Sequence, residues 1–403
     1  MAELQGPARL SQKLKAKRTR ALLRYQYYEM KNLTGYFSKL IPDSYRWMSE
    51  CLGWCTKSVD SLATRLSFNE FRNDNFGFNE IYQLNNPDIL YDSAMLSALI
   101  TSCSFIYIAE DETGAPRMQV IDGTNATGVI DPQTGLLTEG YAVLDRDEHD
   151  KPVLCAYFET GRTTFFPKGG EAYVIENTAP APLLVPIIFR PDARRPFGHS
   201  RISRASMSIM DQALEELLRT RVSSEFYSFP QKWVIGMSES ADFNNKLATY
   251  SNFLRIDKDE DGDRPVVGQF QSGSMGPHID YIKMLAAQFA GETGLTLDDL
   301  GFVSANPATA EAIKASYENL RLVAVKAQKT FGSGFINAGY LAACVRDKVP
   351  YKREQIYQTV CAWDPMFVPD ASALSGIGDG IIKLEQSKPG YITDEKMYDL
   401  VGF

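Results

Sequence analysis

Hydrophobic residues recur at helical spacing through the first ninety positions of the chain. The segment LSQKLKAKRTRALLRYQYYEMKNLTGYF (10–37) places Leu and Tyr every three to four positions among Lys and Arg, and this period is typical of amphipathic helices. The Asn-rich turn LNNPD (84–88) ends the region. The pattern therefore predicts that the chain begins with helices.

From about Ser102 to Phe189 the pattern changes to short runs of β-prone residues. SFIYIAE, MQVID, GYAVLDRD and KPVLCAYFE alternate with turn sequences such as DETGAP, DPQTG and KGG. Strands of this length, with turns so closely spaced, favour a small antiparallel sheet or barrel.

Helical spacing returns in the second half of the chain. Apolar residues of 203–226 fall on one face of a helix, and Pro230 stops that helix. Two strand-prone runs in 231–271 flank an acidic turn and predict a small insert of strands. HIDYIKMLAAQFAG (278–291) then predicts a second helix, which glycines end.

A very long helix is predicted after a polar loop. Asn306 and Pro307 are the residue types of a helix N-cap and first helical position. The helical pattern continues to about Lys348, and about 40 helical residues would span on the order of 60 Å. We expect such a helix to be too long for an ordinary compact core.

Three glycines in that helix are positions where we expect kinks: Gly332, Gly334 and Gly339. Beyond the helix, QIYQTVCAWD (355–364) predicts a strand, and short helices are expected up to Phe403.

Composition and charge restrict the class of protein. The 403 residues are 44% hydrophobic and 23% charged, as in globular proteins. The net charge of −8 argues against a protein that coats nucleic acid, although residues 1–40 carry nine Lys and Arg against two Glu. That basic face could meet nucleic acid, but a solvated helix face or a subunit contact is favoured. The six cysteines lack framework spacing and predict reduced thiols.

Membrane and metal sites are not predicted. The longest apolar run, PLLVPIIF (182–189), is too short to span a bilayer. The acidic turn with Asp257, Asp259 and Asp261 begins like a calcium-binding EF-hand loop, but Gly268 stands where that loop needs a bidentate Glu. We interpret it as a solvated turn between two strands.

Motifs for catalysis or cofactor binding are also lacking. The chain has no GxxxxGK[ST], GxGxxG, GxSxG or HExxH sequence. His149, His199 and His278 have no obvious partner in sequence. The acidic pairs Glu215–Glu216 and Asp298–Asp299 are expected to face solvent, because adjacent helical side chains point in different directions. The sequence therefore predicts no enzyme and no cofactor.

One arginine-rich stretch raises the question of a phosphate site. RRPFGHSRISRA (194–205), counted from Arg190, completes five arginines in fifteen positions around His199. Gly198 and Ser200 could supply backbone and hydroxyl donors near a helix start, which is a common geometry for binding an anion.

The order of these elements resembles bacteriophage portal proteins of long-tailed phages, of the type found in actinobacterial phages and prophages. The residues that carry the resemblance run from RRPFGHSRISRASMSIMDQALEELLRTRVSSEFYSFPQKWVIGM (194–237) through HIDYIKMLAAQFAGETGLTLDDLGFVSANPATAEAIKASYENL (278–320) to VKAQKTFG (325–332). Residues 1–190 resemble these proteins mainly in their succession of helix-prone and strand-prone segments. The matched segments occur along this chain in the same order as in portal proteins.

The resemblance implies an α+β portal fold. Its regions would be a wing of N-terminal helices and an antiparallel β module (1–202), a first stem helix (203–228), a small α/β clip (229–275), a second stem helix (276–293), a tunnel loop (294–307), a long helix (308–348), and a wing-return strand with short crown helices (349–403).

The resemblance also implies a function. The chain would form a homo-oligomeric ring, usually a dodecamer, at one capsid vertex, through which double-stranded DNA is packaged and ejected. Expected partners are the terminase large subunit, a head–tail connector protein, and the major capsid or scaffold protein. The ring would assemble in the host cytoplasm and reside in the virion. Clip residues expected to contact terminase or connector are Lys232, Trp233, Asp257, Asp259 and Asp261.

A protein channel for DNA must let the duplex slide through without binding it tightly. A strongly basic bore would trap the duplex through counterion release, so we expect polar, small and sparsely basic side chains around the channel. The tunnel-loop candidates are Ser304, Asn306, Thr309 and Lys314.

In this context the arginine-rich stretch is interpreted as a subunit interface or hinge. Arg201 and Arg204 would pair with acidic groups on a neighbouring subunit, and Pro196–Gly198 would set the turn from wing to stem. The full candidate set is Arg194, Arg195, Arg201 and Arg204. Two alternatives stay open: a nucleic-acid-processing enzyme that uses the Arg190–Arg204 cluster, and a related ring-forming tail or collar adaptor.

Overall fold

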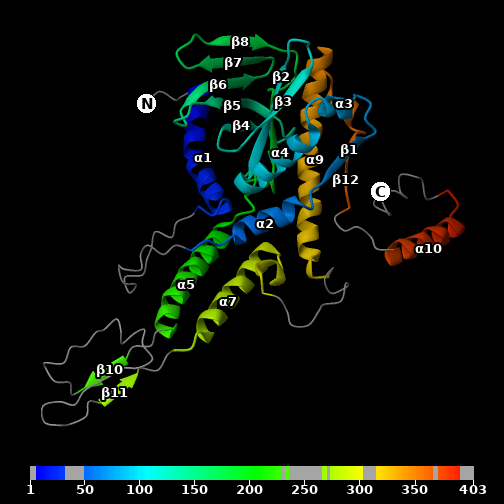
Figure 1. Cartoon of the computed structure of the whole chain (residues 1–403). Coiled ribbons are helices and arrows are strands. Elements are labelled where there is room, and N and C mark those ends of the chain that lie inside the picture. Colours follow the sequence, from blue (N-terminus) through cyan, green and yellow to red (C-terminus); the bar gives the residue numbers. More distant parts are fainter. Residues whose placement is uncertain are drawn as a thin grey trace.

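Two helices project from an α+β body in the computed structural model of the chain (Figure 1). The structure describes residues 6–31, 50–228, 232–235, 266–269, 273–302, 315–365 and 371–390. Within these ranges, no helix is both long enough and apolar enough to cross a membrane.

The described residues among the first hundred form helices, as predicted, with one strand among them. The helices are α1 (Pro7–Tyr28), α2 (Trp54–Ala63), α3 (Phe78–Gln83) and α4 (Pro87–Thr101). The turn at 84–88 does not end the helical region, because Pro87 is the first residue of α4. The missed strand is β1 (Phe68–Arg72), which pairs antiparallel with β12 (Val360–Trp363) from the far end of the chain.

The β-rich region forms two antiparallel sheets, whereas the sequence suggested a single sheet or barrel. The three-stranded sheet has the order β3 (Pro116–Ile121), β2 (Cys103–Glu110), β9 (Leu184–Ile188). The five-stranded sheet is a meander of β4 (Ala126–Ile130), β5 (Leu137–Arg146), β6 (Pro152–Glu159), β7 (Arg162–Pro167) and β8 (Tyr173–Glu176).

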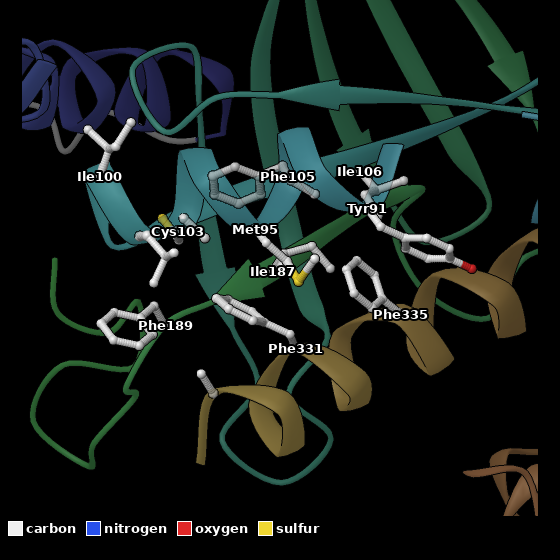
Figure 2. Close-up of a cluster of buried hydrophobic side chains, with 14 of the residues drawn as sticks. Tyr91, Met95, Ile100, Cys103, Phe105, Ile106, Ile187, Phe189, Phe331 and Phe335 are labelled. Atoms are coloured by element: carbon white, nitrogen blue, oxygen red, sulfur yellow. The ribbon is translucent and has the colours of Figure 1, made fainter. Parts of the chain in front are cut away.

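The main core lies between α4, the three-stranded sheet and the long helix α9 (Glu318–Asp347). Figure 2 shows Phe331 and Phe335 of α9 directed toward Met95 of α4 and Ile187 of β9. Phe331 and Phe335 are fully buried, and the Phe335 ring lies 4.8 Å from that of Tyr91. Burying aromatic side chains of this size is a major source of folding free energy.

Helix α1 packs on the face of the five-stranded sheet that the main core leaves uncovered. Leu10 and Leu14 contact Tyr141 and Val143 of β5 in a separate apolar cluster. On the same helix, Lys17 lies 5.3 Å from the ring centroids of both Phe105 and Phe197. The predicted basic face of α1 is therefore partly packed on its own chain.

Helix α9 is a core helix in its C-terminal half, which corrects the expectation that it is too long for a compact core. From Phe331 to Val345 nearly every residue is buried. The glycines predicted as kinks lie in one continuous helix (Figure 1) and are points of close approach instead. A Cβ on Gly334 would lie 2.7 Å from Ile187, and one on Gly339 2.9 Å from Phe78. The predicted start at Asn306 and Pro307 lies outside the described residues.

The projecting helices are α5 (Arg204–Ser228) and α7 (Gly276–Thr293), close to their predicted bounds. At their far end, β10 (Lys232–Ile235) and β11 (Val266–Gln269) pair antiparallel, and this confirms the predicted insert of strands for the described residues (Figure 1). The tail carries the predicted strand as β12, and among its residues described beyond that strand is the helix α10 (Ala371–Ser387).

Candidate functional site

A buried polar contact joins the two projecting helices. Glu216 of α5 is 5% exposed, and its Oε1 lies 2.5 Å from His278 Nδ1 of α7. Arg219 lies one turn further along α5, with its guanidinium 3.5 Å from the second Glu216 oxygen and 2.5 Å from Glu215. Two expectations are corrected here: Glu216 does not face solvent, and His278 does have a partner.

The junction between the helix pair and the body is built around Arg201. This side chain is only 7% exposed, and it donates Nε to the Ser58 carbonyl at 3.2 Å and Nη2 to the carbonyl of Thr293, the last residue of α7. Burial lowers the pKa of the Arg201 guanidinium to about 10. Next to it, Ser203 donates to Glu292 at 2.7 Å. One arginine therefore connects α2, the entry to α5 and the end of α7.

This position corrects the expectation that Arg201 pairs with an acidic group on a neighbouring subunit, because its donors bind carbonyls of its own chain. Arg204, three residues later, is exposed at the start of α5. Its proposed interface role stays a prediction.

Helix α1 fixes α5 from the other side. Tyr27 donates its hydroxyl to the Asp211 carboxylate, with O···O distances of 2.7 and 2.8 Å, and Arg24 Nε donates to the Ile202 carbonyl at 3.3 Å. Burial and the bond to Asp211 both raise the pKa of Tyr27, so the phenol stays a donor. The sequence analysis did not identify this pair, because 184 positions separate the two residues.

The arginine-rich turn is stabilised by bonds within the chain. Asp192 accepts the backbone N–H groups of Arg194 and Arg195 at 2.8 and 2.7 Å, and His199 Nε2 lies 2.6 Å from its carboxylate. His199, expected to lack a partner, is thus paired with Asp192. The side chains of Arg194 and Arg195 remain exposed.

The donors proposed for a phosphate are already used. Gly198 donates its N–H to the Arg195 carbonyl at 2.8 Å, and Ser200 donates its hydroxyl to the Ile100 carbonyl at 2.5 Å. Gly198 has φ +72°, and a Cβ there would collide with the Phe189 carbonyl. This glycine therefore belongs to a turn packed against the body, and neither of the two proposed donors is free for an anion.

The described first part of the predicted tunnel loop (294–307) is joined to Tyr317, the residue before α9. Asp299 accepts the Thr296 N–H at 3.0 Å and the Tyr317 hydroxyl at 3.0 Å, and the Arg65 guanidinium lies 5.0 Å from the Tyr317 ring. Burial alone would raise the pKa of Asp299, but the bonds from Thr296 and Tyr317 outweigh it and lower that pKa. Asp299 was expected to face solvent, but it is half-buried and its hydrogen bonds join Thr296 to Tyr317.

The loop candidates themselves, Ser304, Asn306, Thr309 and Lys314, lie outside the described residues, as do Asp257, Asp259 and Asp261 of the acidic turn. In the described ranges, no group of His, Cys, Asp and Glu is arranged to hold a metal ion. The clip candidates Lys232 and Trp233 lie on β10, where Trp233 is opposite Gly268 of β11 and its ring covers the space that a Cβ would take.

Comparisons with known proteins extend over nearly the whole chain. No protein-family profile matches it. The portal protein of Mycobacterium phage L5 is 23% identical over 399 residues, which is 92% of this chain and 82% of that protein. The portal protein of Mycobacterium phage D29 is 24% identical over 401 residues, with the same coverage. The chain is a homologue of phage portal proteins, of the actinobacterial phage type.

The fold of this portal homologue also has a counterpart among solved structures. A chain from the virion of a native gene transfer agent particle aligns with a TM-score of 0.50 at 13% identity, covering 96% of this chain and 99% of that chain. This likeness supports the α+β fold. The predicted resemblance to phage portal proteins, and with it the predicted portal function, are confirmed.

Proposed function

We propose that this portal homologue assembles as a ring, a dodecamer, and that double-stranded DNA passes through its central channel during packaging and ejection. The observation that carries the proposal is the similarity to two phage portal proteins over 92% of the chain. The projecting helix pair with a hairpin at its far end, set on a body by directional polar contacts, is consistent with a stem that carries a docking element.

The regions of the chain take the following roles in this proposal. The body up to residue 202 is the wing, and β12 returns to it beside β1. Helices α5 and α7 are the stem, and β10–β11 lies in the clip (229–275). The tunnel loop (294–307) follows α7, the long helix (308–348) contains α9, and α10 belongs to the crown.

The tunnel loop makes weak, sequence-independent contact with the duplex. Asp299, Tyr317 and Arg65 hold its base, while Ser304, Asn306 and Thr309 offer small polar groups and Lys314 one cation. A single cation per subunit attracts phosphates without trapping the duplex. Lys314→Glu in an otherwise intact phage is expected to impair DNA packaging or retention; unchanged packaging and retention contradict this role.

The clip docks the terminase large subunit during packaging and the head–tail connector protein afterwards, and the wing meets the capsid or scaffold protein. Lys232 is exposed on β10, and Ile235 and Val266 on the same hairpin are 65% and 60% exposed. Exposed apolar groups beside a cation are suited to a protein partner.

Negative-stain electron microscopy of the purified protein tests the ring directly. Rings with a central hole are expected, and class averages give the number of subunits. A small species with metal-dependent nuclease activity would instead favour the nucleic-acid-processing enzyme. Rings that do not bind the terminase large subunit would favour a tail or collar adaptor.

A further inference from the structure

Positive charges gather where helix α1 meets the arginine-rich turn. Lys13, Lys17, Arg20 and Arg24 follow one another at spacings of four, three and four residues, which places them along one face of α1. The half-buried Phe197 of the turn lies beneath the first two, with its ring centroid 5.3 Å from both lysine Nζ atoms. A row of four cations on the helix therefore runs beside the turn.

The turn adds Arg195 to this row. Burial first, and then the charges of Arg20 and Arg195, lower the pKa of Arg24, so the three guanidinium groups are close neighbours. Arg24 also donates Nη1 to the Arg20 carbonyl at 3.0 Å. We call the five residues the basic strip: Lys13, Lys17, Arg20, Arg24 and Arg195.

Carboxylates of the chain leave the arginines of the strip largely uncompensated. Arg20 has no ion-pair partner among the described residues, and the guanidinium of Arg24 donates only to carbonyls there. The turn 190–200 contains one carboxylate, Asp192, which binds His199 and backbone N–H groups. Like charges at these spacings destabilise a helix, so an anionic ligand would relieve their repulsion.

The length of the strip fits a chain of phosphates. From Lys13 to Arg24 it extends for about 16 Å at about 1.5 Å per residue, and that length of a DNA duplex carries about ten phosphate charges. Lys13 and Lys17 each donate one hydrogen bond within the chain, which leaves two of the three N–H donors of each ammonium. A small anion would use only part of this row, whereas a polyanion would meet all of it.

The chemistry of the strip favours nucleic acid over an acidic protein. Protein interfaces centre on buried apolar anchors, but Phe197 is half-buried beneath the lysines, and Leu23, 42% exposed, lies only at the border of the strip. Surfaces that bind the DNA backbone are polar and strongly positive. The net charge of −8 does not oppose such contact, because salt screens charges more than about 8 Å away.

We propose that the basic strip binds the phosphate backbone of double-stranded DNA at a surface outside the channel. Its place outside the channel rests on the proposed function, because a bore this basic would trap a moving duplex through counterion release. The contacts are to backbone phosphates, so binding is independent of base sequence and weakens steeply as salt rises.

A covalently closed circular duplex tests the proposal, because it cannot thread a closed ring. Binding of the full-length chain to this circle is measured by electrophoretic mobility shift over a range of salt concentrations. We expect binding, and a slope of log affinity against log salt of about −4, since each neutralised phosphate contributes about −0.9.

Variants locate the binding. Arg20→Gln/Arg195→Gln removes two cations of the strip, and we expect it to bind the circle about ten-fold more weakly, with a slope shallower by about 2. The matched control Arg117→Gln/Arg162→Gln changes the net charge equally at two exposed arginines that pair with carboxylates, and it should bind within about two-fold of wild type. Arg20→Lys/Arg195→Lys keeps both charges and should also bind normally, which separates loss of charge from a fault in folding.

The proposal is overturned if the circle is not bound, if Arg20→Gln/Arg195→Gln binds it like wild type, or if the control weakens binding as much as that variant. Equal affinity for a poly-glutamate of the same charge would assign the strip to an acidic protein instead. Loss of rings in Arg20→Gln/Arg195→Gln with unchanged DNA binding would assign it to a neighbouring subunit.

Ring formation is scored by microscopy on the same samples, so that the two proposals fail separately. Rings that bind linear DNA but no circle reject the strip as a DNA site and leave the channel role intact. Binding of the circle without rings supports the strip and rejects the ring.

Discussion

The body is packed by apolar residues, whereas the projecting helix pair combines apolar packing, as at Leu214 and Phe289, with buried polar contacts. In the body, Phe331 and Phe335 of α9 are buried among apolar residues of α4 and β9 (Figure 2). In the helix pair and its junction, Arg201, Glu216 and His278 are hydrogen-bonded at buried or half-buried positions. Apolar burial is non-directional, but hydrogen bonds require fixed angles. Apolar burial therefore stabilises both regions, while the added polar contacts fix the direction in which the helices project.

The largest effect is expected in the apolar body. Phe335→Ala removes a fully buried ring that contacts Tyr91 at 4.8 Å, and we expect the free energy of unfolding to fall by about 3–5 kcal/mol. Chemical denaturation measures the change. Leu322→Ala, at a 48% exposed position on the same helix, should change it by less than about 0.5 kcal/mol. Similar losses for the two variants would show that the C-terminal half of α9 is not the core.

The junction should come next. Arg201→Met removes donors to two buried carbonyls, and we expect a loss of about 2–3 kcal/mol together with faster hydrogen exchange at the end of α7. Arg204→Met makes the same substitution at an exposed position and should alter the free energy of unfolding by less than about 0.5 kcal/mol. If Arg204→Met proved as costly as Arg201→Met in the unassembled chain, the internal role of Arg201 would be wrong.

Close helix packing can be tested at a glycine. Gly334→Ala would bring a Cβ within 2.7 Å of Ile187, and we expect a loss of about 1–3 kcal/mol from overpacking. Gly376→Ala in α10 meets no atom within 4 Å and should be neutral or stabilising by about 0.5–1 kcal/mol, because alanine favours the helix. Thermal unfolding compares the two. Stabilisation by Gly334→Ala would contradict the close approach of this glycine to Ile187.

The smallest effect concerns pH at the loop base. The pKa of Asp299 is lowered in the folded chain, so its contribution to stability is complete above its unfolded pKa of about 3.9 and is lost as pH falls through the folded value. Unfolding measured between pH 6 and pH 3 should show wild type and Asp299→Asn converging at the acidic end. A constant difference across that range would mean that the Asp299 charge does not hold the loop base.

The sequence predicted much of the local structure. The helices at 204–228 and 276–293, the β-rich run after Ser102 and the strands at 232–235 and 266–269 follow from the period of apolar residues and from turn residues. The family resemblance was visible in the same segments. These signals depend on near neighbours in the chain, and a sequence displays them directly.

Only the tertiary structure determined which polar residues are buried and which partners they bind. Arg201 and Arg204 have the same chemistry three positions apart, yet one is buried and the other exposed. Glu216 meets His278 across 62 positions, and Phe68 pairs with Trp363 across the length of the chain. Burial and hydrogen bonding depend on which elements pack together in space, and the local period of apolar residues does not specify that packing.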